Sequence, residues 1–185
     1  FILLAMAKER TELRHKTAAM TDALTGLPNR RAFLQDAETL LQQQIARDCP
    51  IAVLLIDLDH FKSINDRFGH AVGDKVLQIF AKTTRAGLRQ TDLIGRLGGE
   101  EFTAVLSDAG VDNAYLVADR LRRAFAAAAA VVDGETIYAT ASIGVAVIVD
   151  PRQDLAKLIT LADQALYLAK ARGRNRVEVA PLEVA

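Results

Sequence analysis

The sequence contains almost no cysteine, and this absence limits the kinds of site that it can build. Cys49 is the single cysteine among 185 residues, so an internal disulfide is excluded. The sequence also has no cluster of cysteine and histidine with zinc-ligand spacing, which removes the usual signature of a structural zinc site. A chain that forms no disulfide fits a reducing, cytosolic setting.

Signals of unusual architecture are missing as well. We find no internal repeat, low-complexity linker or proline-rich stretch, and the chain has only 4 prolines. Its length of 185 residues, 51% of them hydrophobic, is enough for one globular domain with its own core and a short appended segment. A second full domain is not expected.

Neither sign of charge is in excess. The 23 basic and 23 acidic residues give a formal net charge of +0. A neutral chain has no global electrostatic attraction for a nucleic-acid polymer or an anionic surface, so no nucleic-acid polymer is expected as a partner. Any binding of phosphate must therefore come from a local group of residues.

No hydrophobic run is long enough to cross a membrane by itself. The chain opens with "FILLAMA", far short of the ~20 residues that a spanning helix needs, and no signal-peptide cleavage pattern follows. Because basic residues come next, this opening fits either the end of a membrane helix on its cytoplasmic side or an amphipathic helix. Met6, Leu13 and Met20 recur every seven residues, so we expect residues 1–21 to form a helical stalk, although polar residues occupy the other core register.

Hydrophobic periodicity and breakers predict alternating helices and strands. We expect helices over 29–47, 73–88, 111–130 and 154–173, and strands over 51–59, 92–97, 101–107, 136–149 and 176–180. Asn29 is the expected N-cap of the first helix, and Gly173 the C-cap of the last. Gly98 and Gly99 predict a two-residue hairpin turn, which requires an antiparallel pair of strands. The chain therefore fits an α+β sheet with packed helices better than an all-parallel sheet.

Two acids end the most hydrophobic strand. Asp57 and Asp59 follow the apolar run "IAVLLI", and positions two apart in a strand point the same way. Charges beside a buried strand are costly unless they are paired or bound to metal, and Mg²⁺ prefers carboxylate oxygens together with substrate phosphates. The alternative is structural: one acid caps the following turn and the other pairs with a base such as Lys62.

The acids after the glycine turn favour the metal interpretation. Glu100 and Glu101 start the next strand on opposite faces, so only one of them can readily point at the end of the Asp57 strand. If the two strands are neighbours, Asp57 and one glutamate form a metal pair. This arrangement suits phosphoryl or nucleotidyl transfer, in which metal ions neutralise phosphate charge.

The segment "FKSINDRFGHAVGD" adds polar groups between the acidic strand and the next helix. Lys62 can meet a phosphate, while Asn65 and Asp74 offer the donor and acceptor that a guanine edge requires. Each also has a structural alternative, because Asn65 suits a turn and Asp74 suits the first turn of a helix. His70, in a turn-rich loop, is more often a solvated or capping residue than a base.

A basic cluster lies near the C-terminus. Cations near a helix end are stabilised by the helix dipole, and they can also clamp the anionic tail of a triphosphate. The residues are Lys170, Arg172, Arg174 and Arg176.

Five stretches of the sequence, taken in order, form a recognisable set. They are "DALTGLPNRR" at 22–31, "DLDHFKSINDRFGHAVGD" at 57–74, "RLGGEEF" at 96–102, "ASIGVA" at 141–146 and "ADQALYLAKARGRNRV" at 162–177. Together they span roughly residues 22–177, nearly the whole chain outside the stalk. In these stretches the chain resembles the GGDEF family of diguanylate cyclases, and "GGEEF" is one of the family's accepted spellings.

The resemblance implies a fold and a reaction. The fold is palm-like α+β, related to nucleotide cyclases and polymerases, with a mostly antiparallel central sheet surrounded by helices over 22–180 and a tail at 181–185. The reaction is condensation of two GTP into cyclic di-GMP and pyrophosphate, with Mg²⁺ or Mn²⁺ as cofactor. Because one domain holds one GTP, the resemblance also implies that a homodimer is the active form.

The resemblance assigns roles to individual positions. Asp57 and Glu100 would hold the metal with help from the Leu58 carbonyl and from Glu101, and Glu100 would also accept the proton of the attacking 3′-hydroxyl. The positions that would contact GTP are Asn65 and Asp74 at the guanine, His70 and the glycines Gly98 and Gly99, and Phe61, Lys62, Lys170 and Arg174 near the phosphates.

The stretch "RQTD" matches the RxxD inhibitory site of the same family. Arg89 and Asp92 would bind the product, because an arginine forks onto a guanine or phosphate while the aspartate accepts from the base. Arg120 aligns with a secondary product contact. The alternative for Arg89 and Asp92 is a surface ion pair worth at most ~1 kcal/mol.

Two other classes of protein stay open. A cyclic di-GMP receptor would be expected to have lost Asp57 or the "GGEEF" acids, and a polymerase or adenylate-type cyclase would lack the Asn65/Asp74 pair and RxxD; this sequence keeps all of them. His60 occupies a position where the family often has an aromatic residue. Family members also generally carry a sensory module upstream, so this is expected to be a cytoplasmic domain that a preceding helix can attach to a bacterial inner membrane.

Overall fold

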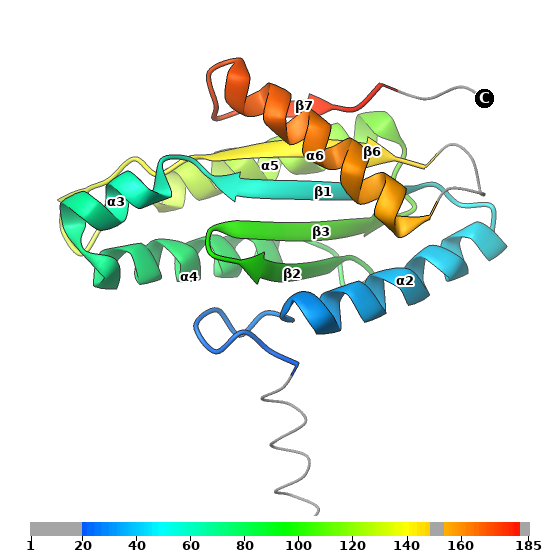
Figure 1. Ribbon diagram of the computed structural model, residues 1–185, viewed down its shortest axis with the longest axis horizontal. Helices are drawn as coiled ribbons and strands as arrows, with labels where there is room; N and C mark the ends of the chain where they lie inside the picture. The colour runs from blue at the N-terminus through cyan, green and yellow to red at the C-terminus, as the bar shows by residue number, and fades with distance from the viewer. Residues whose placement is uncertain (1–19, 149–153, 182–185) are drawn as a thin grey trace, which may run out of the picture.

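A five-stranded sheet carries the structure, and helices cover both of its faces (Figure 1). The computed structural model describes residues 20–148 and 154–181. The strands, in the order in which they lie in the sheet, are β2 (Leu93–Gly98), β3 (Glu101–Ser107), β1 (Ile51–Leu58), β6 (Ala141–Val147) and β7 (Val177–Val179). The helices are α2 (Arg30–Ala46), α3 (Phe61–Phe68), α4 (His70–Gly87), α5 (Val111–Ala128) and α6 (Leu155–Ala171).

β1 is the central strand because it is apolar on both faces. All of its residues are buried, and it pairs antiparallel with β3 on one side and with β6 on the other. Its alternate side chains enter two separate cores, Leu54 and Ile56 in one and Val53 and Leu55 in the other. The expected α+β class with a mostly antiparallel sheet is confirmed, and β7 runs parallel to its neighbour β6.

Each core belongs to one pair of helices. α4 and α5 cover one face, where the Phe80 ring lies 4.5 Å from Phe102 and 5.0 Å from Phe125 between ring centroids. α2 and α6 cover the other face. The start of α2 agrees with the sequence prediction, because the Asn29 side chain accepts from the Ala32 amide. The C-cap of α6 is one residue earlier than predicted: it is Arg172, and Gly173, with a φ of 109°, follows it.

α6 packs directly on β6, because Gly144 leaves room for its backbone. A Cβ atom at Gly144 would lie 2.1 Å from the Ala162 carbonyl oxygen and 2.3 Å from the Leu166 nitrogen, both in α6. The close approach brings the last turn of α6 to the sheet near the end of β1. Lys170 reaches Asp57 from this turn.

Several predicted boundaries are wrong for local reasons. The segment after β1 forms a helix, α3, and α4 begins at His70 rather than near residue 73. The strand expected over 136–149 contains regular pairing only in β6, because residues 131–136 form a separate hairpin of β4 (Val131–Val132) and β5 (Glu135–Thr136). β-branched residues extend across both segments, so composition alone does not mark the break.

The stalk expected over 1–21 lies outside the described residues except for its last two positions, and the tail expected at 181–185 does so except for its first. In the part of the chain that the structure describes, no helix has the length and apolar character needed to cross a membrane.

Candidate active site

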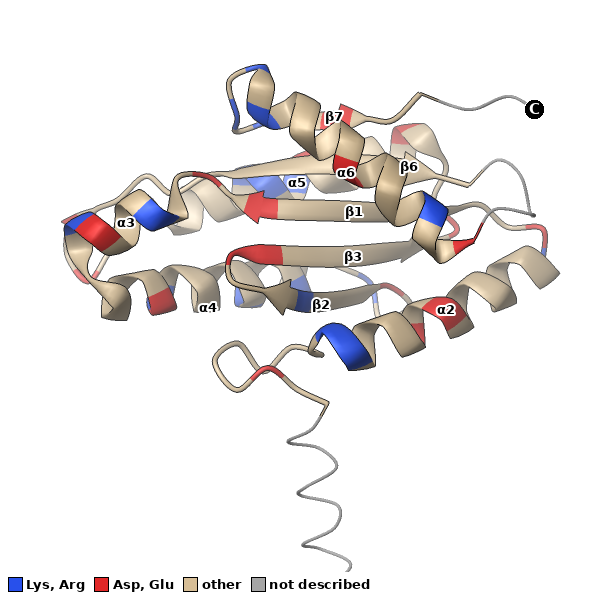
Figure 2. Cartoon of the chain, viewed as in Figure 1, with Lys and Arg blue, Asp and Glu red and all other residues tan. Residues whose placement is uncertain are grey.

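Three acidic residues lie at neighbouring positions where β1 ends and β3 begins. Asp57 and Glu101 are register partners across the β1–β3 pair, and the Leu58 amide donates to the Glu100 carbonyl at 3.3 Å. Figure 2 shows acidic residues at the end of β1 and at the start of β3, on neighbouring strands. The neighbouring strands that the sequence required for a metal pair are therefore present.

The Asp57 carboxylate is paired with a cation from α6. Lys170 Nζ lies 2.8 Å from Asp57 Oδ2, so the base is Lys170 and not Lys62. Burial raises the pKa of Asp57 above its ordinary value, and the hydrogen bond from Lys170 acts in the opposite direction. The negative charges of Glu100 and Glu101 raise it further. Asp57 is 8% exposed, so a second carboxylate charge beside it is costly without a cation.

The donor set fits a hard divalent cation. Asp57, Glu100 and Glu101 supply carboxylate oxygens, which Mg²⁺ and Mn²⁺ prefer, and the Lys170 ammonium occupies the side of Asp57 where a cation is favoured. Within residues 20–148 and 154–181, no three acidic, histidine or cysteine side chains already lie close enough together to hold a metal. A bound metal would therefore draw the carboxylates together.

The turn of the hairpin is one residue later than the sequence predicts. Gly98 pairs with Glu101, so Gly99 and Glu100 form the turn, and the register shifts between Arg96 and Gly98. Gly98 and Gly99 have φ values of 155° and 50°. The expectation that Glu100 starts a strand is wrong, because the irregularity in β2 moves the turn. Glu100 is presented from a tight loop instead of from the sheet.

Arg96 holds this turn, and sequence reasoning did not identify it. Its Nε and NH2 atoms donate to the Gly99 carbonyl at 3.0 and 2.7 Å, and NH1 donates to both oxygens of Asp22 at 3.0 and 3.2 Å. Burial raises the pKa of Asp22, but hydrogen bonds from Thr25 and Arg96 outweigh it, so the net pKa lies below the ordinary value. The segment that precedes α2 is thereby connected to the glycine turn. The two partners are 74 residues apart in sequence, which local patterns do not relate.

α3 begins directly after β1 and brings the expected phosphate residues beside the acids. Phe61 is its first residue and is buried, whereas Lys62 is exposed in the first turn. The N-terminus of a helix favours anions, since its first N–H groups have no partner within the helix. Lys170 comes from the end of α6, and Arg174 follows in the next loop with a φ of 61°. Three separate elements thus place cations or N–H groups around the end of β1.

Asn65 and Asp74 lie on two helices that pack closely. A Cβ atom at Gly73 would lie 1.9 Å from Asn65 Oδ1, so the glycine makes room for this carboxamide beside the turn that carries Asp74. His70 and Asp74 are both exposed and share one face of α4 because they are four residues apart. The structural alternatives are wrong: Asn65 is in a helix rather than a turn, and α4 has no acid in its first turn.

The Asp59 carboxylate is hydrogen-bonded within the fold and is not exposed in the candidate site. It is 3% exposed, and the Thr140 and Ser142 hydroxyls each donate to it at 2.7 Å. The Asn175 backbone N–H donates to the same carboxylate at 3.0 Å. Asp59 is therefore held by hydroxyl and backbone donors, whereas Asp57, two residues earlier, pairs with the Lys170 ammonium.

The RxxD residues line a pocket of about 450 Å³ between α4 and β2. The Asp92 carboxylate accepts from the Arg89 backbone N–H at 2.9 Å and from the Ser107 N–H at 3.2 Å. Asp92 therefore bonds to the backbone, whereas the alternative interpretation had it in a surface ion pair with Arg89. Arg85 also lines this pocket and was missed in the sequence. Arg120 lies elsewhere: it donates to the Gly87 carbonyl at 2.8 Å and lines a groove between α4 and α5.

Comparison with known proteins decides the family. The model of the family described as diguanylate cyclase, GGDEF domain, matches residues 19–176. The chain belongs to the GGDEF domain family. Diguanylate cyclase DgcP of Pseudomonas aeruginosa is 45% identical over 168 residues, which cover 88% of this chain and 24% of that protein.

Solved GGDEF domains have the same fold. The coiled coil and GGDEF domain of DgcB from Caulobacter crescentus, in complex with c-di-GMP, aligns with a TM-score of 0.85 at 27% identity and covers 96% of this chain and 97% of that one. The active GGEEF domain of a diguanylate cyclase from Vibrio cholerae aligns with a TM-score of 0.77 at 34% identity, covering 84% and 98%. The chain spans between 24% and 46% of the length of the curated relatives that it matches.

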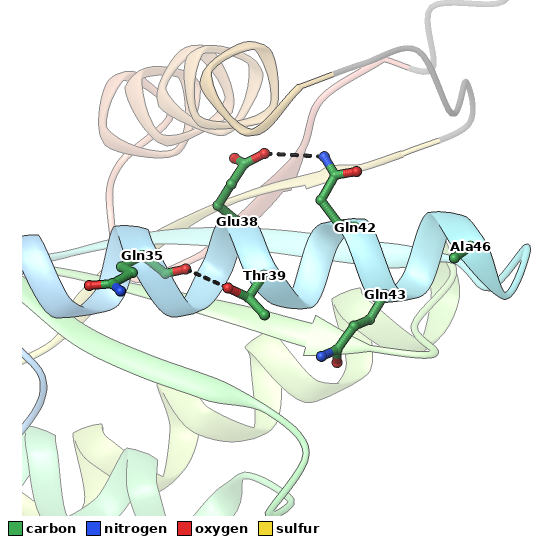
Figure 3. Close-up of a pocket in the computed structure, with 6 residues that line it drawn as sticks. All are labelled: Gln35, Glu38, Thr39, Gln42, Gln43 and Ala46. Carbon is green, nitrogen blue, oxygen red and sulfur yellow. Dashed lines mark hydrogen bonds between the residues drawn. The ribbon is translucent and has the colours of Figure 1, made fainter.

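Another hollow in this GGDEF domain lies away from the acids. It is a shallow area on the exposed side of α2, lined by Gln35, Glu38, Thr39, Gln42, Gln43 and Ala46 (Figure 3). Glu38 accepts from Gln42, and Thr39 donates to the Gln35 carbonyl, so the polar groups satisfy one another along the helix. No basic side chain lines it, and it has no feature that would hold a nucleotide.

Proposed function

We propose that this GGDEF domain condenses two molecules of GTP into cyclic di-GMP and two pyrophosphates, with Mg²⁺ or Mn²⁺ and as a homodimer. The observation that carries the proposal is the placement of Asp57, Glu100 and Glu101 at neighbouring ends of β1 and β3, with Lys170 paired to Asp57 and with Asn65 and Asp74 on α3 and α4. Acids and a cation at one end of a strand suit a metal-bound triphosphate, and the two helices suit a guanine.

The chain's own groups account for binding and orientation. The Asn65 carboxamide can donate to the guanine carbonyl, and the Asp74 carboxylate can accept from the guanine amino group. A base without that pattern of groups leaves both side chains unpaired. Lys62, Lys170 and Arg174 hold the anionic tail. A metal held by Asp57, Glu100, Glu101 and the Leu58 carbonyl would neutralise charge on the triphosphate.

The reaction forms and breaks one bond at each phosphorus. The 3′-oxygen of one GTP attacks the α-phosphorus of the other, the bond from that phosphorus to the bridging oxygen breaks, and pyrophosphate leaves. Glu100 accepts the proton of the 3′-hydroxyl, from a turn that Arg96 fixes through the Gly99 carbonyl. Two such steps close the ring, and each requires two domains with their sites facing. Catalysis is then mainly positioning and charge neutralisation.

The proposal includes product inhibition at the pocket lined by Arg89 and Asp92. Its arginines, Arg85 among them, can fork onto guanine or phosphate acceptors, and the pocket is separate from the acids at the end of β1. Arg120 lines a different groove in the described structure, so it contacts product only if its side chain leaves the Gly87 carbonyl. In the whole protein, we propose that a sensory module, which a membrane helix can anchor, precedes this domain.

The test compares bases, with two variants. The nucleotide-free chain is incubated with Mg²⁺ and either GTP or ATP, and the products are separated by chromatography and identified by mass. We expect cyclic di-GMP from GTP, no cyclic dinucleotide from ATP, and loss of product in Glu100→Ala. Asp36→Asn, which changes an exposed carboxylate on α2, serves as the matched control and should retain the activity. Tight binding of cyclic di-GMP without any turnover would make the domain a receptor.

A further inference from the structure

We propose that Asp59 is a positioning residue, which holds the loop after α6 so that Arg174 faces the metal end of β1. Asp59 was one of the two acids that the sequence offered as a metal pair, and the role of metal ligand does not account for it. The inference rests on the proposed function, because it concerns the part of that site which binds the triphosphate.

The donors around Asp59 come from two distant segments, the start of β6 and the loop after α6. Oδ1 accepts from the Ser142 hydroxyl in β6 at 2.7 Å, and Oδ2 accepts from the Thr140 hydroxyl at 2.7 Å and from the Asn175 backbone N–H at 3.0 Å. The Asp59 N–H donates in turn to the Thr140 carbonyl at 2.8 Å. A carboxylate that is 3% exposed and accepts three hydrogen bonds is a fixed part of the frame.

The loop that Asp59 holds has an unfavourable backbone. Gly173, Arg174 and Asn175 have consecutive positive φ values of 109°, 61° and 46°. For residues other than glycine this region is sterically unfavourable, so it persists only where surrounding contacts enforce it. Arg174 therefore depends on contacts elsewhere to keep its orientation.

Four contacts supply that constraint. The Gly173 and Arg174 amides donate to the carbonyls of Lys170 and Ala169 at the end of α6, at 3.4 and 3.0 Å. Asp59 holds the Asn175 amide, and the Asn175 side chain accepts from Arg122 NH1 of α5 at 2.7 Å. Arg122 is itself fixed by Asp119, which accepts from its Nε and NH2 atoms at 2.9 and 2.7 Å.

The geometry couples two parts of the site through one carboxylate. Asp57 in β1 pairs with Lys170, which precedes the loop, and Asp59, directly after the end of β1, anchors the loop just after Arg174. One short segment at the end of β1 thus contacts the chain on both sides of Arg174. Release of Asp59 would free Arg174 while Asp57 and Lys170 stay in place.

The test uses binding of 3′-deoxy-GTP, which has no attacking hydroxyl and therefore does not turn over. We expect Asp59→Asn to weaken its affinity about tenfold, roughly the effect of losing one charged hydrogen bond. The amide keeps one acceptor but cannot match three donors. Arg174→Ala should weaken binding by a similar factor, and the double variant should bind no worse than Arg174→Ala alone, since Asp59 acts through Arg174.

Two further variants separate positioning from loss of structure. Thr140→Val removes one donor to Asp59 but leaves the bond to Asn175, so it should lower the melting temperature without changing the affinity for 3′-deoxy-GTP. Arg122→Ala removes the contact to the Asn175 side chain from a partly exposed position. It should weaken binding of 3′-deoxy-GTP several-fold when Arg174 is present and should have no further effect in the Arg174→Ala variant, as expected for Asp59→Asn. If Asp59→Asn does not fold, Arg122→Ala still measures how release of the loop changes the affinity for 3′-deoxy-GTP.

Unchanged affinity in both Asp59→Asn and Arg122→Ala would overturn the inference, as would equal losses with and without Arg174. Failure of the proposed function is recognised separately, because it would appear as binding of 3′-deoxy-GTP by the wild-type chain without formation of cyclic di-GMP from GTP.

Discussion

At the scale of single residues, Asp57 sits where a carboxylate is hard to accommodate without a cation. Burial raises its pKa, the hydrogen bond from Lys170 lowers it, and two neighbouring glutamates raise it again. The net shift is upward, so the ion pair with Lys170 does not fully offset the cost of burying the charge. Sites that bind metal often lower the stability of the unliganded fold in this way.

This balance predicts opposite effects of Asp57→Asn on activity and on stability. Activity should fall by a factor of about 100 or more, since charge neutralisation at a phosphate contributes several kcal/mol. The melting temperature of the metal-free chain should stay the same or rise, because a neutral amide is less costly to bury. Initial rates and thermal unfolding of one preparation measure both. A melting temperature well below that of the wild type would instead give Asp57 a structural role.

Gly73 provides a second prediction at this scale. In Gly73→Ala the new methyl group would lie 1.9 Å from Asn65 Oδ1, so the carboxamide must move away from Asp74. We expect the KM for GTP to rise about tenfold, the cost of roughly one hydrogen bond to a charged or buried group, and the preference for GTP over ATP to fall. Gly110→Ala is the matched control, because its φ is −73° and nothing lies near the added atom. Similar losses of selectivity in both variants would contradict the role of Asn65.

At the scale of elements, the connection between the segment before α2 and the glycine turn is the feature that positions the loop carrying Glu100. Arg96 reaches in both directions, to Asp22 and to the Gly99 carbonyl. The bulge in β2 gives the turn its irregular register, and the guanidinium compensates by fixing the carbonyl that the turn exposes.

The Asp22 carboxylate gives this connection a dependence on pH. Its folded-state pKa lies below the ordinary 3.8, so it stabilises the fold fully above that value, and the contribution is lost as the pH falls through the lower folded pKa. We expect Asp22→Asn to lower the free energy of unfolding by about 1 kcal/mol near neutral pH. Urea unfolding at a series of pH values should show this difference shrinking below about pH 4. A difference that stays constant down to pH 3 would argue against the ion pair.

Elements with strong local signals could be predicted from the sequence. β1 follows from a continuous apolar run, the start of α2 from the Asn29 cap, and the end of α6 from Gly173. α3 was missed because its eight residues carry mixed polar character, and β4 and β5 because each is two residues long. Such short elements are specified by tertiary contacts more than by local pattern.

The residues of the candidate site also separate into those with a local sequence signal and those that depend on long-range contacts. Asp57, Glu100 and Glu101 could be recognised because acids next to an apolar strand and a glycine turn are conspicuous in a sequence. Arg96 and Asp22 could not, since their pairing depends on how the chain folds back over 74 residues. The structural role of Asp59 was equally hidden, because its partners lie 81, 83 and 116 residues away.

At the scale of the whole molecule, the acids and the RxxD pocket are separate, so product binding and turnover can be measured apart. We expect Arg89→Ala to raise the concentration of cyclic di-GMP needed for half-inhibition at least about tenfold, because the proposed product site would lose a guanidinium that can fork onto guanine or phosphate. Rates are normalised to the uninhibited rate of each variant. Arg47→Ala, an exposed cation beyond the end of α2, is the control. Inhibition that is unchanged in Arg89→Ala would remove this pocket from the account.

The central claim is that two of these domains, each holding one GTP, face each other to form cyclic di-GMP. The most direct measurement is the rate of cyclic di-GMP formation per chain from GTP and Mg²⁺, by the nucleotide-free protein over a wide range of chain concentrations, with products identified by mass. We predict cyclic di-GMP as the product and a rate per chain that rises with concentration before it levels off. GTP left unconverted by folded protein at every concentration would contradict the claim.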